Sequence, residues 1–305
     1  MTPKKANVLF CVLLGVSLLT AGVLELGARF FASAPDLPAA LILSQLSLVL
    51  PCLVFAMLTP GTLQEMFPLR RVKFRSLLLA LVMMVALFPT VMLINVLTSL
   101  LSGNAATAVL QELPAWDPAL MVILIGVFGP FCEEAVFRGY VYQSLRRGDR
   151  WKTAIFLSAL FFGLMHMNWN QAAYATVLGI FFALLTRAAG SLWPAILAHM
   201  SLNSFEVLAM YSTAGDAQEL ASEAVLAEEL AMIGDAMIYG APVLLVLVLG
   251  GLALALLCVH RVEVLEDRIP PPEEENFVRL PTIGIFTVVG VVSAVFFMSW
   301  SQWLS

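Results

Sequence analysis

Long apolar runs, bounded by charged residues, proline or glycine, dominate this chain. A helix needs about 20 apolar residues to cross the hydrocarbon core of a bilayer. Runs of this order occupy residues 8–32, 39–59, 76–101, 118–137, 241–260 and 282–304. Residues 153–211 are also apolar, but polar residues, Gly190 and Pro194 interrupt them, which predicts three further helices joined by very short turns. The pattern therefore predicts an all-α, polytopic transmembrane bundle with about eight or nine spans.

The composition agrees with a membrane protein and excludes several other classes. Of the 305 residues, 61% are hydrophobic and 12% are charged, whereas a soluble domain is about half apolar and about a quarter charged. The net charge of -5 and the lack of a long Lys/Arg run exclude a nucleic-acid partner. All four cysteines lie in apolar runs, where single thiols behave as small hydrophobes, so a disulfide scaffold is excluded as well.

The basic residues predict how the helices are oriented, because Lys and Arg are retained on the cytoplasmic side. With the N-terminus inside and nine spans, every Lys and Arg except Arg29 falls in a cytoplasmic segment. The acidic segment 213–240 then lies on the opposite side. The first run is longer than a signal-peptide core, so we expect a retained helix. We expect a multi-pass protein with a cytoplasmic N-terminus, in the plasma (inner) membrane if the chain is bacterial.

Few ionisable residues fall inside the predicted helices. Each costs roughly 2.5 to 3.5 kcal/mol on insertion scales and therefore calls for an explanation. The set, with two uncharged asparagines included, is Glu25, Asn95, Glu133, Glu134, Arg138, His166, His199, Asn203 and Glu206.

Glu133 is the member of the first acidic cluster that is suited to proton transfer. On a helix Glu134 and Arg138 are four residues apart and face the same way, so they can form an ion pair. Glu133 points about 100° away and has no such local partner. The alternative for both carboxylates is a role in helix packing, which we favour for Glu134 with Arg138 and not for Glu133.

The two histidines each allow a structural and a functional interpretation. His166 follows Phe162 by one helical turn and, taken alone, is more typical of a packing residue. His199 and Asn203 share one helix face, with Glu206 a further turn along. This pair suits either an interhelical hydrogen bond or the stabilisation of a developing oxyanion. If the clusters converge in one cavity, their polar groups can form hydrogen bonds and ion pairs with one another. Together they then supply the groups needed to activate water and stabilise a tetrahedral intermediate.

The three motifs, taken in order, resemble those of the CPBP family of intramembrane proteases. They are EExxxR at 133–138, FxxxH at 162–166 and HxxxN at 199–203, and the resemblance covers residues 118–211. This family includes the Rce1-like CAAX prenyl endopeptidases and bacterial proteins linked to bacteriocin self-immunity. The resemblance implies an intramembrane endopeptidase that hydrolyses a peptide bond of a membrane-associated or lipidated (CAAX-like) substrate.

The resemblance also implies a role for each motif residue. Glu133 corresponds to the general base on water, and His166 orients or shares that proton. His199 and Asn203 stabilise the oxyanion. Glu134, Arg138 and Phe162 occupy supporting positions.

The residues alone do not decide whether the site binds a metal. The family is often called a metalloprotease, and His166, His199 and Glu133 together match a His₂Glu zinc site with an open position. The chain contains no HExxH, however, and a metal-free mechanism uses all four polar residues. We favour the metal-free chemistry.

Other protease chemistries lack their residues. All six aspartates lie in predicted loops, at positions 36, 117, 149, 216, 235 and 267, so an intramembrane aspartate pair is absent from the sequence. No GxSxG-like serine stands near a histidine. Cys132 is next to Glu133, but a thiol in apolar surroundings is inert. The alternatives to a protease are a transporter that uses Glu and His as a proton relay, and a catalytically inactive immunity or scaffold protein.

The depth of His166 requires one further feature. Counted from Thr153 at 1.5 Å per residue, His166 lies about 20 Å into the membrane, whereas Glu133 is near the cytoplasmic end of its helix. They can meet only if the helix at 138–147 and the next one form a hairpin that projects into the cytosol. We therefore divide the chain into N-terminal helices (1–117), a catalytic core (118–212), an acidic non-cytoplasmic segment (213–240) and C-terminal helices (241–305).

Overall fold

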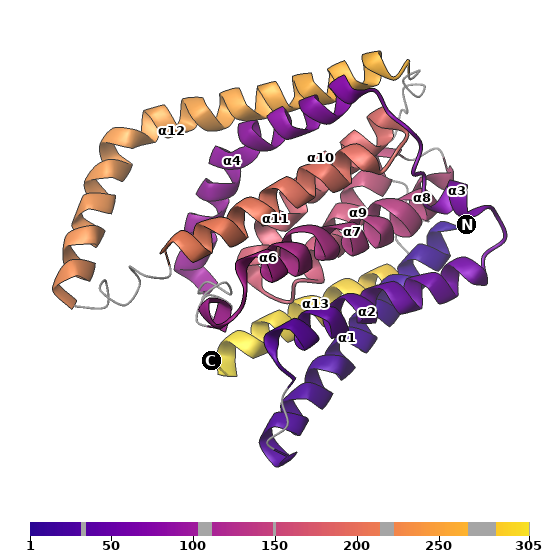
Figure 1. Ribbon diagram of the computed structural model, residues 1–305, viewed down its shortest axis with the longest axis horizontal. Helices are drawn as coiled ribbons and strands as arrows, with labels where there is room; N and C mark the ends of the chain where they lie inside the picture. Colours follow the sequence, from indigo (N-terminus) through magenta and orange to yellow (C-terminus); the bar gives the residue numbers. More distant parts are fainter. Residues whose placement is uncertain (32–34, 103–111, 149–150, 214–222, 268–284, 305) are drawn as a thin grey trace.

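A computed structural model shows the chain as a bundle of helices (Figure 1). It describes residues 1–31, 35–102, 112–148, 151–213, 223–267 and 285–304, and these ranges contain no β-strand. Asp149, Asp216 and most of the proline- and glutamate-rich stretch after 267 lie outside the described residues. The all-α, polytopic fold class predicted from the apolar runs is confirmed.

The helices follow the predicted apolar runs closely. Those that stand alone are α1 (Pro3–Phe31), α2 (Leu37–Met57), α4 (Phe74–Ser102), α9 (Trp151–Leu164), α10 (Trp169–Ala189), α11 (Trp193–Thr213), α12 (Glu223–Leu265) and α13 (Ile285–Leu304). One composite helix consists of α6 (Pro118–Met121), η2 (Val122–Phe128), α7 (Gly129–Glu134), η3 (Ala135–Val141) and α8 (Tyr142–Leu145). Shorter elements are α3 (Leu63–Met66), η1 (Leu113–Ala115) and η4 (Arg146–Gly148).

Length and apolar composition together identify the helices that can cross a membrane on their own. Among the described residues, six helices qualify: Pro3–Leu24, Leu37–Met57, Phe74–Ser99, Pro118–Leu145, Trp169–Ala189 and Val243–Leu265. The other three predicted spans correspond to α9, α11 and α13, which do not meet these criteria. The 14 residues of α9 reach only about 21 Å at 1.5 Å per residue, less than the hydrocarbon core. In α11, His199, Asn203 and Glu206 lower the mean hydropathy. In α13, the structure leaves several of the side chains of the helix undescribed.

The helix that contains the apolar run 118–137 continues to Leu145, with η4 after it, as the depth of His166 required, and α8 packs against α9. The helix expected to start at 241 already begins at Glu223, and the described part of the acidic segment is therefore one long helix with the span that follows (Figure 1). The rest of that segment, 214–222, lies outside the described residues.

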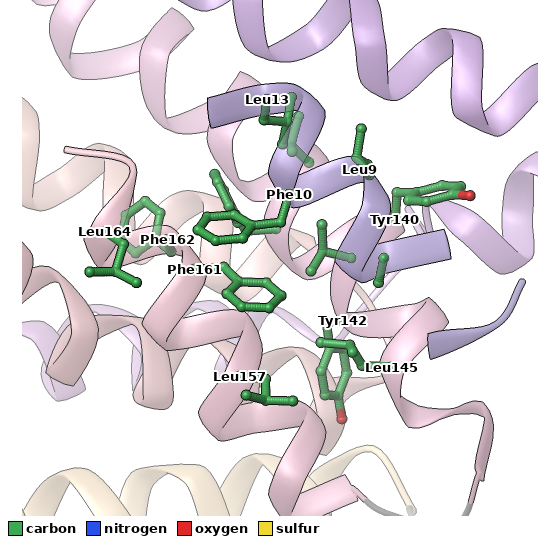
Figure 2. Packing of buried hydrophobic residues seen from close by; sticks show 14 of the residues in the cluster. Leu9, Phe10, Leu13, Tyr140, Tyr142, Leu145, Leu157, Phe161, Phe162 and Leu164 are labelled. Atoms are coloured by element: carbon green, nitrogen blue, oxygen red, sulfur yellow. The ribbon is translucent and has the colours of Figure 1, made fainter. Parts of the chain in front are cut away.

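Helix α10 is the most deeply buried of the six candidate spans. It packs against α4, α9, α11, α12 and η3. One apolar cluster joins α1, α2, η3, α8 and α9, where the rings of Phe10 and Phe161 stack 4.0 Å apart (Figure 2). A second joins α4, α10, α11 and α12. Polar groups placed between the two clusters are therefore removed from bulk solvent, and the outer helices keep exposed apolar faces, such as Leu245 and Val246, that suit lipid.

The contact between η2 and α11 depends on Gly126. A Cβ at this position would lie 2.5 Å from Ser204 Oγ and 3.0 Å from Ser204 Cα, so a side chain cannot enter without moving one helix. We expect Gly126→Val to destabilise the protein by about 1 to 3 kcal/mol, the usual cost of overpacking. The midpoint of thermal unfolding in detergent measures this. Gly15→Val is the matched control, because a Cβ there meets nothing within 4 Å; an equal loss in both variants contradicts the expectation.

Candidate active site

A cavity into which several polar side chains and an apolar wall both face, here called the polar cavity, lies between α2, the composite helix, α10 and α11. Its volume is about 360 Å³. The residues that line it include Gln45, Glu133, Phe162, His166, Gln171, Tyr174, His199, Asn203 and Glu206, together with apolar side chains. All four residues predicted to be catalytic, Glu133, His166, His199 and Asn203, therefore face one space, although they come from three separate segments of the chain.

Glu133 and His199 are adjacent across this cavity. Glu133 Oε2 lies 3.7 Å from His199 Nε2, and the Nε2 of Gln45, in α2, donates a hydrogen bond of 3.3 Å to Glu133 Oε1. Glu133 is partly exposed to the cavity, with 17% of its side-chain surface accessible. A carboxylate held on one oxygen by an amide leaves the other oxygen, on the His199 side, available for chemistry.

Glu134 faces the other nitrogen of the same imidazole. Its Oε1 lies 3.0 Å from His199 Nδ1 and 3.0 Å from Arg138 Nη1, and the Glu134 and Arg138 side chains are both fully buried. The predicted ion pair is thus present, and Glu134 has a second partner that the sequence did not indicate. Because a carboxylate only accepts hydrogen bonds, Nδ1 of His199 must be the donor. This contact fixes the orientation of the ring.

Aromatic rings hold the cation and both imidazoles in place. The guanidinium carbon of Arg138 lies 4.3 Å from the centre of the Phe162 ring and 5.3 Å from that of Phe182. Phe182 also stacks on His199 at 4.9 Å, and Phe162 meets His199 and His166 edge to face at 5.6 and 5.0 Å. Such cation–π contacts strengthen when they are desolvated. Phe162 therefore connects all three charged or titratable groups.

His166 presents one free nitrogen to the cavity. Its Nδ1 lies 3.0 Å from the carbonyl oxygen of Phe162, one turn earlier, and a carbonyl can only accept. In the neutral ring Nε2 is then an acceptor. His166 follows the end of α9, where Met167 adopts a left-handed backbone conformation with φ of 54°. The break in the helix allows His166 to line the cavity rather than continue along α9.

Asn203 is held against an irregular part of the composite helix. Its Nδ2 donates to the carbonyl oxygen of Ile125 at 3.3 Å. Ile125 lies in the π-helical segment η2, which precedes Pro130, a residue with no N–H to donate to the preceding turn. Wide turns of this kind free backbone carbonyls and are frequent at functional sites. One N–H of the Asn203 amide is used in this contact, and the second is left for the cavity.

Several cavity residues were not singled out by the sequence. Gln45, Gln171 and Tyr174 line the cavity, and Phe182 stacks on His199 from behind its lining. Gln45 could have been noticed, since the apolar run 39–59 contains no other amide and no charged residue. Phe182 could not have been, because one phenylalanine in an apolar helix resembles any other. Glu206, noted only as intramembrane, also lines the cavity.

Asn95, another polar residue of the predicted helices, does not contribute to the site. Asn95 instead accepts a hydrogen bond of 2.8 Å from Asn170 Nδ2 and so joins α4 to α10. The side chain of Glu25 lies outside the described residues.

The donor atoms do not fit the His₂Glu zinc site that was considered. Within the described part of the chain, no three His, Cys, Asp or Glu side chains are grouped as metal ligands. The Nδ1 contacts leave Nε2 of each histidine free, as in histidines that ligate a metal, but only His199 lies next to Glu133. No step below uses a metal, and the metal alternative stays a prediction.

Cys132 is buried on a different side of the helix. It lines a separate, apolar cavity of about 480 Å³ together with Val49, Leu53, Phe131 and Ile196. A nucleophile would have to face the polar cavity instead. We therefore expect Cys132→Ala to retain peptidase activity within about twofold, and the wild type to tolerate a thiol-alkylating reagent, because a buried thiol reacts poorly. A large loss of kcat/KM in a variant that remains folded would contradict this assignment.

The comparisons with known proteins agree with the position of this site. Residues 115–205 match the family model of the Rce1-like type II CAAX prenyl endopeptidases. "Putative membrane peptidase YdiL" of Bacillus subtilis (strain 168) is 30% identical over 105 residues, which are 34% of this chain. The matched part is 41% of the length of that relative. No solved structure matches the chain. The matched segment contains the composite helix, His166, His199 and Asn203.

Proposed function

Since residues 115–205 form an Rce1-like domain, we propose that this multi-pass membrane protein is an intramembrane endopeptidase in which Glu133 activates water. The observation that carries the proposal is the pair of Glu133 and His199 in a cavity within the bundle. The 3.7 Å between Oε2 and Nε2 is too long for a direct hydrogen bond, and the cavity beside the pair has room for a water that contacts both.

The proposed oxyanion role requires a protonated His199, because Nδ1–H already faces Glu134 and only an imidazolium carries a second N–H, on Nε2. Two carboxylates, Glu133 and Glu134, face the imidazole from either side, and Arg138 neutralises only one of them. An imidazolium at His199 balances the remaining charge, as buried charges require. Its Nδ1–H then donates to Glu134 and its Nε2–H points toward Glu133 and the water.

The reaction follows from these positions. Glu133 takes a proton from the water as the water oxygen attacks the scissile carbonyl carbon. The Nε2–H of His199 and the second N–H of Asn203 donate to the oxyanion of the tetrahedral intermediate. The C–N bond then breaks, and the proton held by Glu133 goes to the leaving amine. The Nε2 of His166 acts as a second acceptor that orients the water.

The surroundings support a membrane-associated or lipidated substrate. Leu41, Leu124 and Leu202 line the polar cavity, so a peptide entering it exchanges lipid for an apolar wall. We propose that the N-terminus of this protein lies on the cytoplasmic side of the membrane, in agreement with the distribution of Lys and Arg.

The test uses the full chain purified in detergent and matched peptides with and without a C-terminal lipid group. We expect the lipidated peptides to be cleaved in preference to the plain ones, as detected by mass spectrometry. His199→Ala and Asn203→Ala should each lower kcat about 100-fold or more, the range for loss of an oxyanion donor. Glu65→Gln, on the exposed helix α3, is the matched control and should not change kcat.

Three outcomes contradict the proposal. If His199→Ala cleaves as fast as the wild type, His199 has no role in catalysis. Loss of activity with a chelator, restored by one metal ion, would replace the metal-free mechanism. Absence of cleavage of every peptide by a folded wild type would favour the immunity or scaffold alternative.

A further inference from the structure

A second polar cavity lies at one end of the bundle, apart from the active site. Its volume is about 480 Å³. It is lined by side chains that include Glu65, Arg70, Gln143, Arg146, Arg147, Thr186 and Arg187. Two apolar spans end beside it, at Leu145 and at Ala189. This position is the depth at which the headgroups of a bilayer begin.

The cavity carries more positive than negative charge. Four arginines line it and Glu65 is its only acidic lining residue. Arg147 pairs with Glu65 at 2.8 Å, and Arg187 pairs with Glu263 at 3.2 Å. Among the described residues, no carboxylate lies within ion-pair distance of Arg70 or Arg146.

A buried hydroxyl supplies a second, independent observation. Thr186 is 1% exposed and lines this cavity, yet its Oγ1 has no hydrogen-bond partner in the part of the chain that the structure describes. An unpaired buried hydroxyl costs free energy unless something binds it. A ligand oxygen in the cavity would serve as that partner.

We propose that this cavity binds a phosphate group, with Arg70 and Arg146 as its charged ligands and Thr186 as a neutral donor. Guanidinium groups fit phosphate oxygens in pairs, which makes arginine the side chain best suited to this anion. The site is independent of peptide hydrolysis. The phosphate belongs either to an anionic phospholipid headgroup or to a soluble phosphate.

The experiment measures binding to the full chain in detergent by native mass spectrometry and thermal unfolding. The probes are dioleoylphosphatidylglycerol, dioleoylphosphatidylcholine as the zwitterionic comparison, and inorganic phosphate at matched ionic strength. The test variant is Arg70→Gln/Arg146→Gln. The matched control is Arg71→Gln/Arg75→Gln, which removes two exposed arginines from the same part of the surface without touching the cavity.

We expect the wild type to bind the anionic lipid more tightly than the zwitterionic one, and the test variant to bind it at least about tenfold more weakly. The control variant should bind like the wild type. If inorganic phosphate raises the unfolding midpoint and displaces the lipid, the source is soluble phosphate; if it does neither, the source is the lipid. Both results support the site. Binding lost equally in both double variants, unchanged in both, or absent from the wild type with every probe overturns it.

Discussion

Replacing Glu133 with glutamine is expected to lower kcat/KM by about a thousandfold, within the range for loss of a general base. The amide keeps the size of the side chain and can still contact Gln45, but it cannot take a proton from water. Since Glu133 is partly exposed to the cavity and the amide keeps the shape of the side chain beside Gln45, the variant should fold like the wild type. Initial rates on the best peptide found for the wild type measure this.

The neighbouring carboxylate provides the comparison for this variant. Glu134→Gln disturbs the orientation of His199 and leaves Arg138 buried without its partner, so it should lower the unfolding midpoint as well as kcat. Glu133→Gln should lower kcat alone. If Glu133→Gln retains more than about a tenth of the wild-type rate, a general base at this position is ruled out, because such a base contributes at least about 100-fold.

Replacing Arg138 with methionine is expected to destabilise the protein by about 3 to 5 kcal/mol, because it leaves the fully buried carboxylate of Glu134 without its cation. The rings of Phe162 and Phe182 lose the charge that they contact at the same time. Thermal unfolding in detergent, together with the yield of monodisperse protein, measures the effect.

A double variant separates the structural and catalytic roles of this pair. Glu134→Gln/Arg138→Met removes both charges and should recover most of the lost stability, because replacing a buried ion pair by neutral groups is often neutral. Its activity should stay low, since His199 no longer has a carboxylate on Nδ1. A double variant that is as unstable as Arg138→Met, or one that is fully active, would show that Glu134 and Arg138 do not act in this way.

The helices and the polar residues that converge were largely predictable from the sequence. Apolar runs in lipid must be helical, since no water satisfies the backbone, and every predicted run is a helix. Convergence of Glu133, His166, His199 and Asn203 followed from the cost of burying each of them separately.

The features that were not predicted depend on contacts between residues that are far apart in the sequence. The burial of Val136 to Leu145 against α1 and α9 is one of them, and no local pattern reveals it. Similarly, Glu134 was expected to serve Arg138 alone, because only the four-residue spacing was visible. Its contact with His199 joins residues 65 positions apart and depends on how α7 meets α11.

The most direct measurement of the central claim, that Glu133 and His199 activate water for attack on a peptide bond, is single-turnover cleavage in H₂¹⁸O. Intact-protein mass spectrometry after an acid quench should detect no covalent adduct during turnover by the wild type. The new C-terminal carboxyl group should carry one ¹⁸O, and Glu133→Gln should yield almost no labelled product in the same time. A peptidyl adduct on the wild-type chain, or labelled product formed equally fast by Glu133→Gln, would contradict the mechanism.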